Sequence, residues 1–308
     1  MIYNMKRVLL SLICVCLTLA AWAQNDDFVQ YQLDNGLTVY LWEDHDQPDV
    51  QGWTVTRAGS IDEPANATGL AHYLEHMLFK GTDRIGALDW EKEQPLYEQI
   101  IALYDTLALT TDAKAREAVQ LRINEVSLEA AKYAATDEFS NLVQGIGGEG
   151  LNAFTAYDVT CYMNSFPAYQ MERWLTLYAD RLTNPVFRSF QAELENVFEE
   201  YNMYLDDNST HSRNFIFGKL YEGHAYARDI IGYPEDLKNP KLRQLIDYYN
   251  TWYVPNNMAL ILVGDFDIEA TKPLIEKTFG KLEARPLPAR TEYPTTAFVQ
   301  DERYSAKL

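Results

Sequence analysis

The chain is poor in cysteine and in positive charge. Only three of its 308 residues are cysteine, and two of these, Cys14 and Cys16, lie in an amino-terminal segment that we expect to be removed. Cys161 then has no intrachain partner, so the fold depends on packing, with a metal ion as the one further stabilising device. Lysine and arginine number 26 against 45 aspartate and glutamate residues. This balance disfavours binding to nucleic acid and to anionic membranes.

Long apolar runs are missing beyond the first 23 residues. That segment carries Lys6 and Arg7, an apolar run from Val8 to Ala20, and then Ala21-Trp22-Ala23, which is the layout of a cleavable secretory signal. A membrane anchor is the rival interpretation, but the run is too short to span a bilayer comfortably. We therefore expect residues 1–23 to be a signal peptide and the protein to be exported to the periplasm, with an extracellular location as the alternative.

The mature chain has enough apolar residues for a sizeable core, since 47% of the sequence is hydrophobic. Residues 28–57 are predicted to form strands. Within them Val29–Leu33 and Leu37–Leu41 alternate around Asp34-Asn35-Gly36, which is a strong hairpin signal.

Helical periodicity follows. A helix is predicted from Gly69 to Lys80, with Thr68 as its N-cap and Gly81 as its stop. Two amphipathic helices are predicted between Glu91 and Tyr133, joined by a turn at residues 110–112. They indicate a helical hairpin inserted at about residues 91–140, which we interpret as a structural decoration without a catalytic role.

The second half of the chain mixes strands and helices. The glycines between Gly145 and Gly150 predict a loop, and Leu151–Asn164 has strand-like composition and is a candidate sheet edge. Other expected elements are helices at 168–183, 189–206 and 240–251 and a buried strand at Met258–Val263. The predicted fold class is α+β, with a largely antiparallel sheet flanked by helices. We place the main domain at residues 24–285 and a linker, or the start of a following domain, at 286–308, where prolines recur.

The residues that carry chemistry begin with the segment His72-Tyr73-Leu74-Glu75-His76. With roughly 100° between successive helical residues, its two histidines and its glutamate fall inside an arc of about 100°, on one face of the helix. Because the sequence has only five histidines, this pattern would rarely arise by chance. It indicates a metal site. Two imidazoles and a carboxylate suit zinc, with a fourth position left for water.

The missing carboxylate is expected on the helix near Val186–Asp206, where Glu193 and Glu200 share a face. They are separated by about 10 Å along the helix axis, so both are not expected to bind one ion directly. One can be the ligand while the other orients a ligand histidine. The competing interpretation is an acidic, solvated face shared with Glu195 and Glu199.

Four stretches together resemble the pitrilysin and insulysin family of zinc metallopeptidases, which includes the mitochondrial processing peptidases. They are Arg57-Ala-Gly-Ser60, the run from Gly69 to Thr82, Asn152-Ala-Phe-Thr155, and Glu193 with Val197 and Glu200. The resemblance covers most of the mature chain. It implies one zinc ion per chain bound by His72, His76 and Glu200, with Glu75 as the general base and Glu193 as the supporting carboxylate.

The same resemblance implies a substrate and a partner. Asn152, Ala153 and Phe154 match the stretch where family members offer a sheet edge to an extended peptide or unfolded protein; a plain buried strand is the alternative. Family members also pair an active domain with a homologous one that completes a closed chamber, and we find no counterpart after Arg285. The interval from His76 to Glu200 is longer than usual in the family, and the expected hairpin insertion accounts for the excess.

The predicted function is therefore hydrolysis of peptide bonds by a zinc-dependent endopeptidase. The main alternative is a non-catalytic subunit that binds peptides or assembles with a partner. An inverted-motif carbon–sulfur lyase is a third possibility, and it fits poorly because such enzymes are far shorter and lack the Asn-Ala-Phe-Thr and Glu193/Glu200 elements.

Overall fold

The computed structural model of the chain describes residues 28–135, 137–239, 241–293 and 303–305. The predicted signal segment at residues 1–23 lies outside the described residues. The described chain is built on a six-stranded sheet with the strand order β1-β2-β6-β3-β5-β4. The strands are β1 (Phe28–Gln32), β2 (Thr38–Glu43), β3 (Asp49–Thr56), β4 (Glu149–Thr155), β5 (Thr160–Pro167) and β6 (Met258–Gly264).

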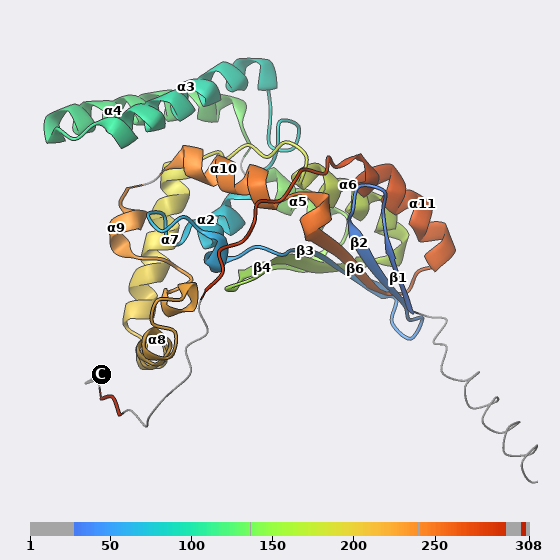
Figure 1. The fold of residues 1–308 in the computed structure, drawn as a ribbon. Coiled ribbons are helices and arrows are strands. Elements are labelled where there is room, and N and C mark those ends of the chain that lie inside the picture. Colours follow the sequence, from blue (N-terminus) through green and yellow to red (C-terminus); the bar gives the residue numbers. More distant parts are fainter. Residues whose placement is uncertain (1–27, 136, 240, 294–302, 306–308) are drawn as a thin grey trace, which may run out of the picture.

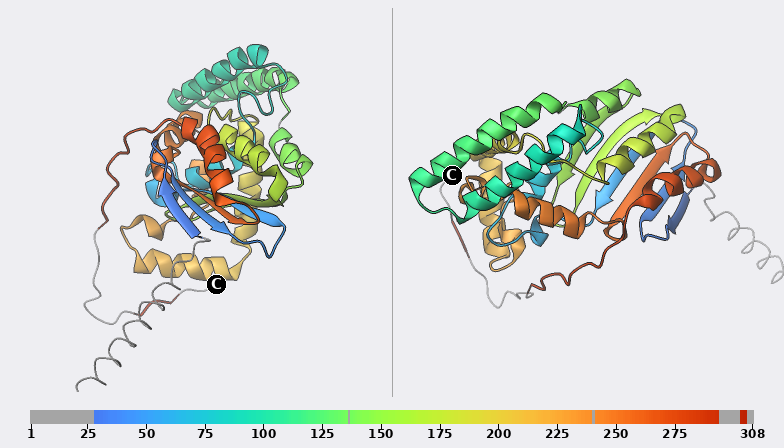
Figure 2. Two further views of the ribbon diagram at one scale, coloured as in Figure 1. Left: turned by 90° about the vertical axis from the view of Figure 1, so that its right-hand side faces the viewer. Right: turned by 90° about the horizontal axis from the view of Figure 1, so that it is seen from above.

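The sheet is largely antiparallel, which confirms the predicted fold class. Only the pairing of β2 with β6 is parallel; the other four strand pairings are antiparallel. Helices cover one face of the sheet (Figures 1 and 2). Alternation along β6 shows why: Leu260 and Leu262 point into the core and are fully buried, whereas Ile261 between them is only partly buried. β6 is central although it comes late in the chain.

The first hairpin forms where the sequence predicts it. β1 and β2 pair in register from Phe28 opposite Trp42 to Gln32 opposite Thr38. Gly36 in the turn has a φ of 87°, a conformation that glycine adopts without strain. The side chain of Asn35 donates to the carbonyl oxygens of Phe279 and Leu282, so the turn is also attached to the end of the folded chain.

The segment after the glycine loop contains two strands, and the prediction of one strand over Leu151–Asn164 is wrong. β4 and β5 form an antiparallel hairpin through a tight turn in which the amide of Ala156 donates to the carbonyl of Val159. The turn residues include neither glycine nor proline, and Asp158 alone is a weak turn signal. β4 is an edge strand of the sheet, as expected.

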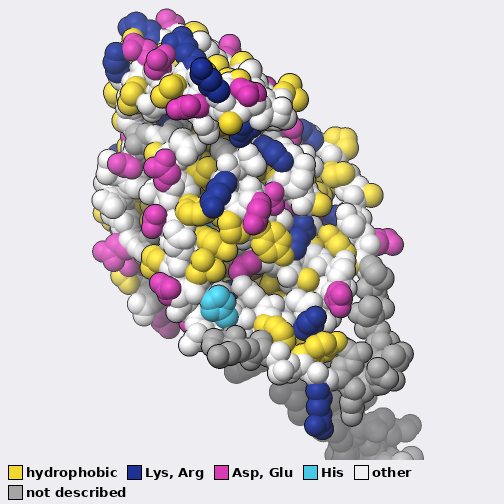
Figure 3. Space-filling model, turned by 90° about the vertical axis from the view of Figure 1, so that its left-hand side faces the viewer, with side chains coloured by type: hydrophobic (Ala, Val, Ile, Leu, Met, Phe, Trp, Pro, Cys, Tyr) yellow, Lys and Arg dark blue, Asp and Glu magenta, His cyan; other side chains and the backbone are white. Residues whose placement is uncertain are grey.

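The helical hairpin consists of α3 (Trp90–Leu109) and α4 (Ala113–Ala130), with Asp112 as the N-cap of α4. Buried Ile100, Ile123 and Val126 pack in its interior. Tyr104 makes an edge contact with Phe190 of the body, at 4.9 Å between ring centres. The hairpin projects from the body (Figure 1), and charged side chains of both signs lie on its surface among hydrophobic and other ones (Figure 3).

The remaining helices include both predicted and unpredicted ones. They are α2 (Leu70–Met77), α5 (Glu138–Gly145), α6 (Met171–Arg181), α7 (Phe190–Leu205), α8 (Asn208–Leu220), α9 (Pro234–Leu237), α10 (Leu242–Trp252) and α11 (Ile268–Thr278). The sequence predicted α2, α6, α7 and α10, but not α5, α8, α9 or α11. Within the described residues, no helix combines the length and apolar character that a membrane crossing needs.

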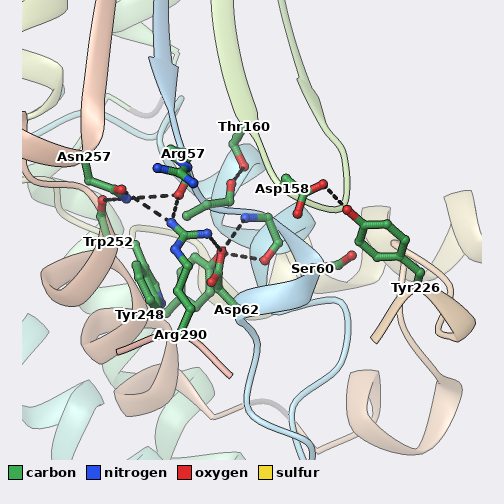
Figure 4. A network of polar contacts seen from close by, with 12 residues as sticks. Arg57, Ser60, Asp62, Asp158, Thr160, Tyr226, Tyr248, Trp252, Asn257 and Arg290 are labelled. Carbon is green, nitrogen blue, oxygen red and sulfur yellow. Dashed lines mark hydrogen bonds and ion pairs between the residues drawn. The ribbon is translucent and has the colours of Figure 1, made fainter. Parts of the chain in front are cut away.

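The tail after α11 is extended and is attached to the body through Arg290 (Figure 4). The guanidinium of Arg290 pairs with Asp62 at 3.2 Å, donates to the carbonyl oxygen of Arg57, and lies 4.8 Å from the ring centre of Trp252. Asp62 in turn accepts a hydrogen bond from the amide of Gly59. The tail is therefore fixed against the loop that leads into α2.

Candidate metal centre

Helix α2 presents His72, Glu75 and His76 on the face predicted for them. Its opposite side is apolar: Leu74 and Met77 are fully buried in the core. This burial fixes the rotation of the helix, because turning it would expose the apolar stripe. The three polar side chains are consequently directed away from the core, into a cleft of about 570 Å³.

The start of α2 is capped differently from the prediction. Gly69, not Thr68, is the N-cap, with a φ of 81°, and a Cβ atom there would lie 2.4 Å from the carbonyl oxygen of Ile231. The carboxylate of buried Glu63 accepts hydrogen bonds from the amides of Gly69 and Ala71. Asp236 accepts from the amide and hydroxyl of Thr68. Backbone amides at the start of α2 are thus hydrogen-bonded to carboxylates from outside the helix.

The other end of α2 is held by Arg181. Its Nε donates to the carbonyl oxygen of Leu78 at 3.0 Å. The guanidinium carbon lies 4.1–4.5 Å from the ring centres of Phe79, Phe139 and Tyr162. A cation at the carboxyl end of a helix is favoured by the helix dipole, and the aromatic faces compensate for part of its burial.

Helix α7 brings Glu193 and Glu200 to the same cleft. Its first residue, Phe190, accepts a hydrogen bond at its carbonyl oxygen from the hydroxyl of Tyr73 on α2. Leu194 and Val197 are buried, so the acidic face turns toward α2. The two helices are joined by packing and by this direct bond.

Three ligand atoms from the two helices converge. The Nε2 atoms of His72 and His76 are 3.4 Å apart, and Oε2 of Glu200 lies 3.7 Å from the first and 3.5 Å from the second. In the described part of the chain, this trio is the one group of three or more histidine, cysteine and acidic residues compact enough to hold a metal ion.

These distances fit a tetrahedral zinc ion. Zinc bonds of 2.0–2.1 Å to nitrogen and oxygen imply an edge of about 3.3 Å between ligands of a tetrahedron. All three measured separations lie close to that value. The donor types, two imidazoles and one carboxylate, also match zinc sites that keep one position for water.

Glu193 and Lys80 orient His76. Oε1 of Glu193 lies 2.9 Å from Nδ1 of His76, which directs the other ring nitrogen toward the ligand cluster. Oε2 of Glu193 lies 2.5 Å from Nζ of Lys80. Burial opposes ionisation of Glu193, but the hydrogen bonds from His76 and Lys80 lower its pKa to about 2. Glu193 is therefore a permanent anion that fixes the histidine.

The two ligand histidines differ in electrostatic surroundings. Burial, reinforced by the neighbouring His76, lowers the pKa of His72 to about 4. Burial also acts to lower the pKa of His76, but hydrogen bonds to Glu193 and Glu200 raise it to about 9. His72 is thus already in the neutral form that binds a metal, whereas His76 must release a proton to do so.

Glu200 and Glu75 have partners of their own. The hydroxyl of Tyr204 donates to Oε1 of Glu200 at 3.0 Å, leaving Oε2 for the cluster. The hydroxyl of Thr155 donates to Oε2 of Glu75 at 2.6 Å. Glu75 is 7% exposed, and burial raises its pKa above the ordinary value despite this hydrogen bond. A raised pKa suits a carboxylate that must accept and return a proton.

The edge strand β4 lines the same cleft. Asn152, Ala153 and Phe154, the predicted peptide-binding residues, are among its lining residues, and Phe154 is 42% exposed. Lys80, Thr155 and Tyr204 were not predicted to act at the site. Lys80 and Thr155 fall inside the family stretches, but nothing local in the sequence reveals their partners.

The fold and the site define an α+β protein in which an HxxEH helix and an acidic helix meet at a candidate metal centre. A model of the insulinase family, peptidase family M16, matches residues 38–93 and 123–233, and a model of the M16 inactive domain matches residues 241–306. The chain belongs to the insulinase family, peptidase family M16.

Similar proteins are named as zinc proteases. The probable zinc protease PqqL of Escherichia coli K12 is 25% identical over 287 residues, which cover 90% of this chain and 26% of PqqL. The zinc protease PqqE of Helicobacter pylori is 23% identical over 230 residues, covering 74% of this chain and 40% of PqqE. The chain thus spans between about a quarter and two fifths of the length of these relatives.

Solved structures share the fold. The crystal structure of the first half of the periplasmic protease PqqL from Escherichia coli superposes with a TM-score of 0.67 at 23% identity, over 89% of this chain and 50% of that chain. A protease from Helicobacter pylori gives a TM-score of 0.66 at 22% identity, over 87% of this chain and 54% of that chain.

Proposed function

We propose that the chain provides the active site of a zinc-dependent endopeptidase that hydrolyses peptide bonds in extended peptides or unfolded proteins. The observation that carries the proposal is the convergence of His72, His76 and Glu200 to within 3.4–3.7 Å of one another, beside the buried carboxylate of Glu75. A solvated acidic face would not hold a buried carboxylate, that of Glu193, against the ring of His76.

The residues have separate roles in this proposal. His72, His76 and Glu200 hold the ion, and Glu193 and Tyr204 orient two of these ligands. A bound zinc ion supplies Lewis acidity, which lowers the pKa of water and polarises a substrate carbonyl.

Glu75 acts as general base and then as general acid. It accepts a proton from the attacking water as the water oxygen bonds to the carbonyl carbon. When the carbon–nitrogen bond breaks, Glu75 returns that proton to the leaving nitrogen, so the carboxylate is regenerated.

We further propose that β4 binds the substrate as an added strand. β4 is an edge strand, so one side of its backbone is available to a peptide lying in the cleft. Asn152 and Phe154 are exposed there and would contact the side chains of the substrate. Backbone pairing favours extended segments over folded ones, which supports unfolded polypeptides as the substrate class.

The complete enzyme is proposed to contain a second, homologous domain or subunit. The relatives are much longer than this chain, and an open cleft leaves the reacting groups in contact with bulk water, which weakens catalysis. We propose export to the periplasm from the amino-terminal signal pattern, and the similarity to a protease described as periplasmic supports this location.

The test compares the wild-type chain with Glu75→Gln and with Glu199→Gln, a matched control on the exposed side of α7. We expect wild type and both variants to bind one zinc ion per chain, measured by atomic absorption. Hydrolysis of an unfolded protein should stop with a chelator, return with zinc, and fall by at least about 100-fold in Glu75→Gln alone.

Two outcomes would contradict the proposal. Full activity in Glu75→Gln would remove Glu75 from the reaction. A wild-type chain that binds peptides but no zinc would favour the non-catalytic binding role instead.

A further inference from the structure

The last residue of the edge strand, Thr155, faces inward. In the β4–β5 hairpin, Ala153 lies opposite Tyr162 and Thr155 lies opposite Thr160. The ring of Tyr162 lies 6.0 Å from that of Phe79, directly after α2, so this row of side chains points toward the core and α2. Thr155 therefore ends an inward row, while its neighbour Phe154 points to the other face of the sheet.

The hydroxyl of Thr155 has one partner among the described residues, and that partner is Glu75. Its hydrogen bond to Oε2 of Glu75 is 2.6 Å long and joins residues 80 positions apart in the sequence. Oε1 of Glu75 has no hydrogen bond to another described residue. The hydroxyl thus occupies one oxygen of the carboxylate and leaves the other for the cleft.

The frame behind Thr155 is rigid. Residues Asn152 to Thr155 pair continuously with Met163 to Thr160 of β5, and the turn that follows is closed by the bond from Ala156 to Val159. A glutamate side chain has three rotatable bonds, so a fixed donor is an effective way to select one of its orientations.

We propose that Thr155 is the positioning residue for Glu75, and that it links the position of the base to the strand that receives the substrate. This inference rests on the proposed function. A peptide that pairs with β4 would lie along the strand that carries Thr155, so the substrate and the base are positioned by the same rigid strand. The hydroxyl acts through Glu75 and does not touch the substrate.

A packing role for Thr155 is the competing explanation. Valine has nearly the same shape as threonine without the hydroxyl, so Thr155→Val separates the two roles, and Thr155→Ser keeps the hydroxyl. Thr160→Val is the matched control: Thr160 lies directly opposite, and its hydroxyl donates to the carbonyl of Ala58 and not to Glu75.

The experiment measures kcat, KM and zinc content for the full chain and these variants, with an unfolded protein as substrate. For Thr155→Val we expect kcat to fall about 10- to 100-fold, as for a misplaced catalytic group, with KM and zinc content unchanged. Thr155→Ser should stay within about threefold of wild type, on the same reasoning. Thr160→Val should lower the melting temperature and leave kcat unchanged.

Two further measurements separate action through Glu75 from a general disturbance. In the Glu75→Gln background, Thr155→Val should cause no additional loss of rate, because groups that act as a unit are not additive. In a chain labelled with 13C-glutamate, Thr155→Val should shift the carboxylate signal that disappears in Glu75→Gln, and Thr160→Val should not.

The outcomes are distinguishable. If wild type is active and Thr155→Val matches it, or if Thr155→Ser falls as far as Thr155→Val, the role of Thr155 is wrong and the proposed function stands. If wild type shows no zinc-dependent hydrolysis, the proposed function itself fails, and the role of Thr155 fails with it.

Discussion

At the scale of single residues, the site depends on a chain of hydrogen bonds that runs from Lys80 through Glu193 to His76. Each contact in it is 2.5–2.9 Å long. Asn196 adds a bond of 3.2 Å to the same glutamate. Lys80 also compensates the negative charge of Glu193, which is 8% exposed. Without the ammonium group of Lys80, the buried negative charge of Glu193 would be less well compensated. The carboxylate would also be freer to rotate away from the imidazole of His76.

Replacement of Lys80 by Met should therefore weaken zinc binding. We expect the dissociation constant to rise about 10- to 100-fold, the usual effect of removing a group that orients a metal ligand. Competition with a chromogenic chelator measures it. Lys92→Met is the control, because Lys92 is exposed and pairs with Asp89, remote from the site. Equal zinc affinity in Lys80→Met and wild type would show that Asn196 and the helix alone hold Glu193.

Some residues of the candidate site could be predicted from the sequence around them, and others could not. His72, Glu75 and His76 could be predicted because helical spacing alone sets their direction, and the family resemblance selected Glu200 among crowded acids. Tyr204 and Thr155 could not. The bond from Thr155 to Glu75 depends on how β4 packs against α2, and no periodicity encodes that contact.

At the scale of elements, α2 is held at its amino end by a carboxylate that is itself hard to ionise. Burial raises the pKa of Glu63 to about 8, although the hydrogen bonds that it accepts from two backbone amides act to lower the pKa. Its folded-state pKa thus lies above the unfolded value. Such an acid contributes stability that is fully present below about pH 4.5 and is lost as the pH rises through about 8.

Glu63→Gln should remove this pH dependence. As the pH rises from about 4.5 to about 8, the free energy of unfolding of the variant should increase relative to that of wild type by a few kcal/mol. The reason is that wild type must ionise a buried group over this pH range. Urea denaturation followed by circular dichroism measures it. Glu91→Gln on exposed α3 controls for the change in net charge. A constant difference across this pH range would mean that Glu63 is ionised throughout.

Elements were predicted where their signals are local. The β1–β2 hairpin has its own turn sequence, and α3 and α4 have clear stripes. The Thr68 cap was wrong because Glu63 and Asp236 reach the helix end from elsewhere in the fold. The β4–β5 turn was missed because Ala156 to Val159 lack glycine and proline. In α8 the apolar residues form no single stripe, and only Thr210 is buried.

At the scale of the whole molecule, the proposed zinc ligands come from two helices separated by a long insertion. The insulinase-family model leaves residues 94–122 unmatched, and this interval lies within the hairpin of α3 and α4. The hairpin adds length between His76 and Glu200 without separating them, because α2 and α7 also pack directly. An ion bound between these helices would connect two segments that are distant in the sequence.

Removal of zinc should consequently destabilise the molecule as a whole. An ion that binds only the folded state at about 100 times its dissociation constant adds about 2.7 kcal/mol, which corresponds to a melting temperature about 5–10 °C higher for a domain of this size. Differential scanning calorimetry with excess zinc and with a chelator measures the shift. Glu75→Gln should retain the shift, because Glu75 is not a ligand, and His76→Ala should abolish it. A shift that persists in His76→Ala would place the stabilising ion elsewhere, and no shift in wild type would mean that α2 and α7 are not joined through a metal.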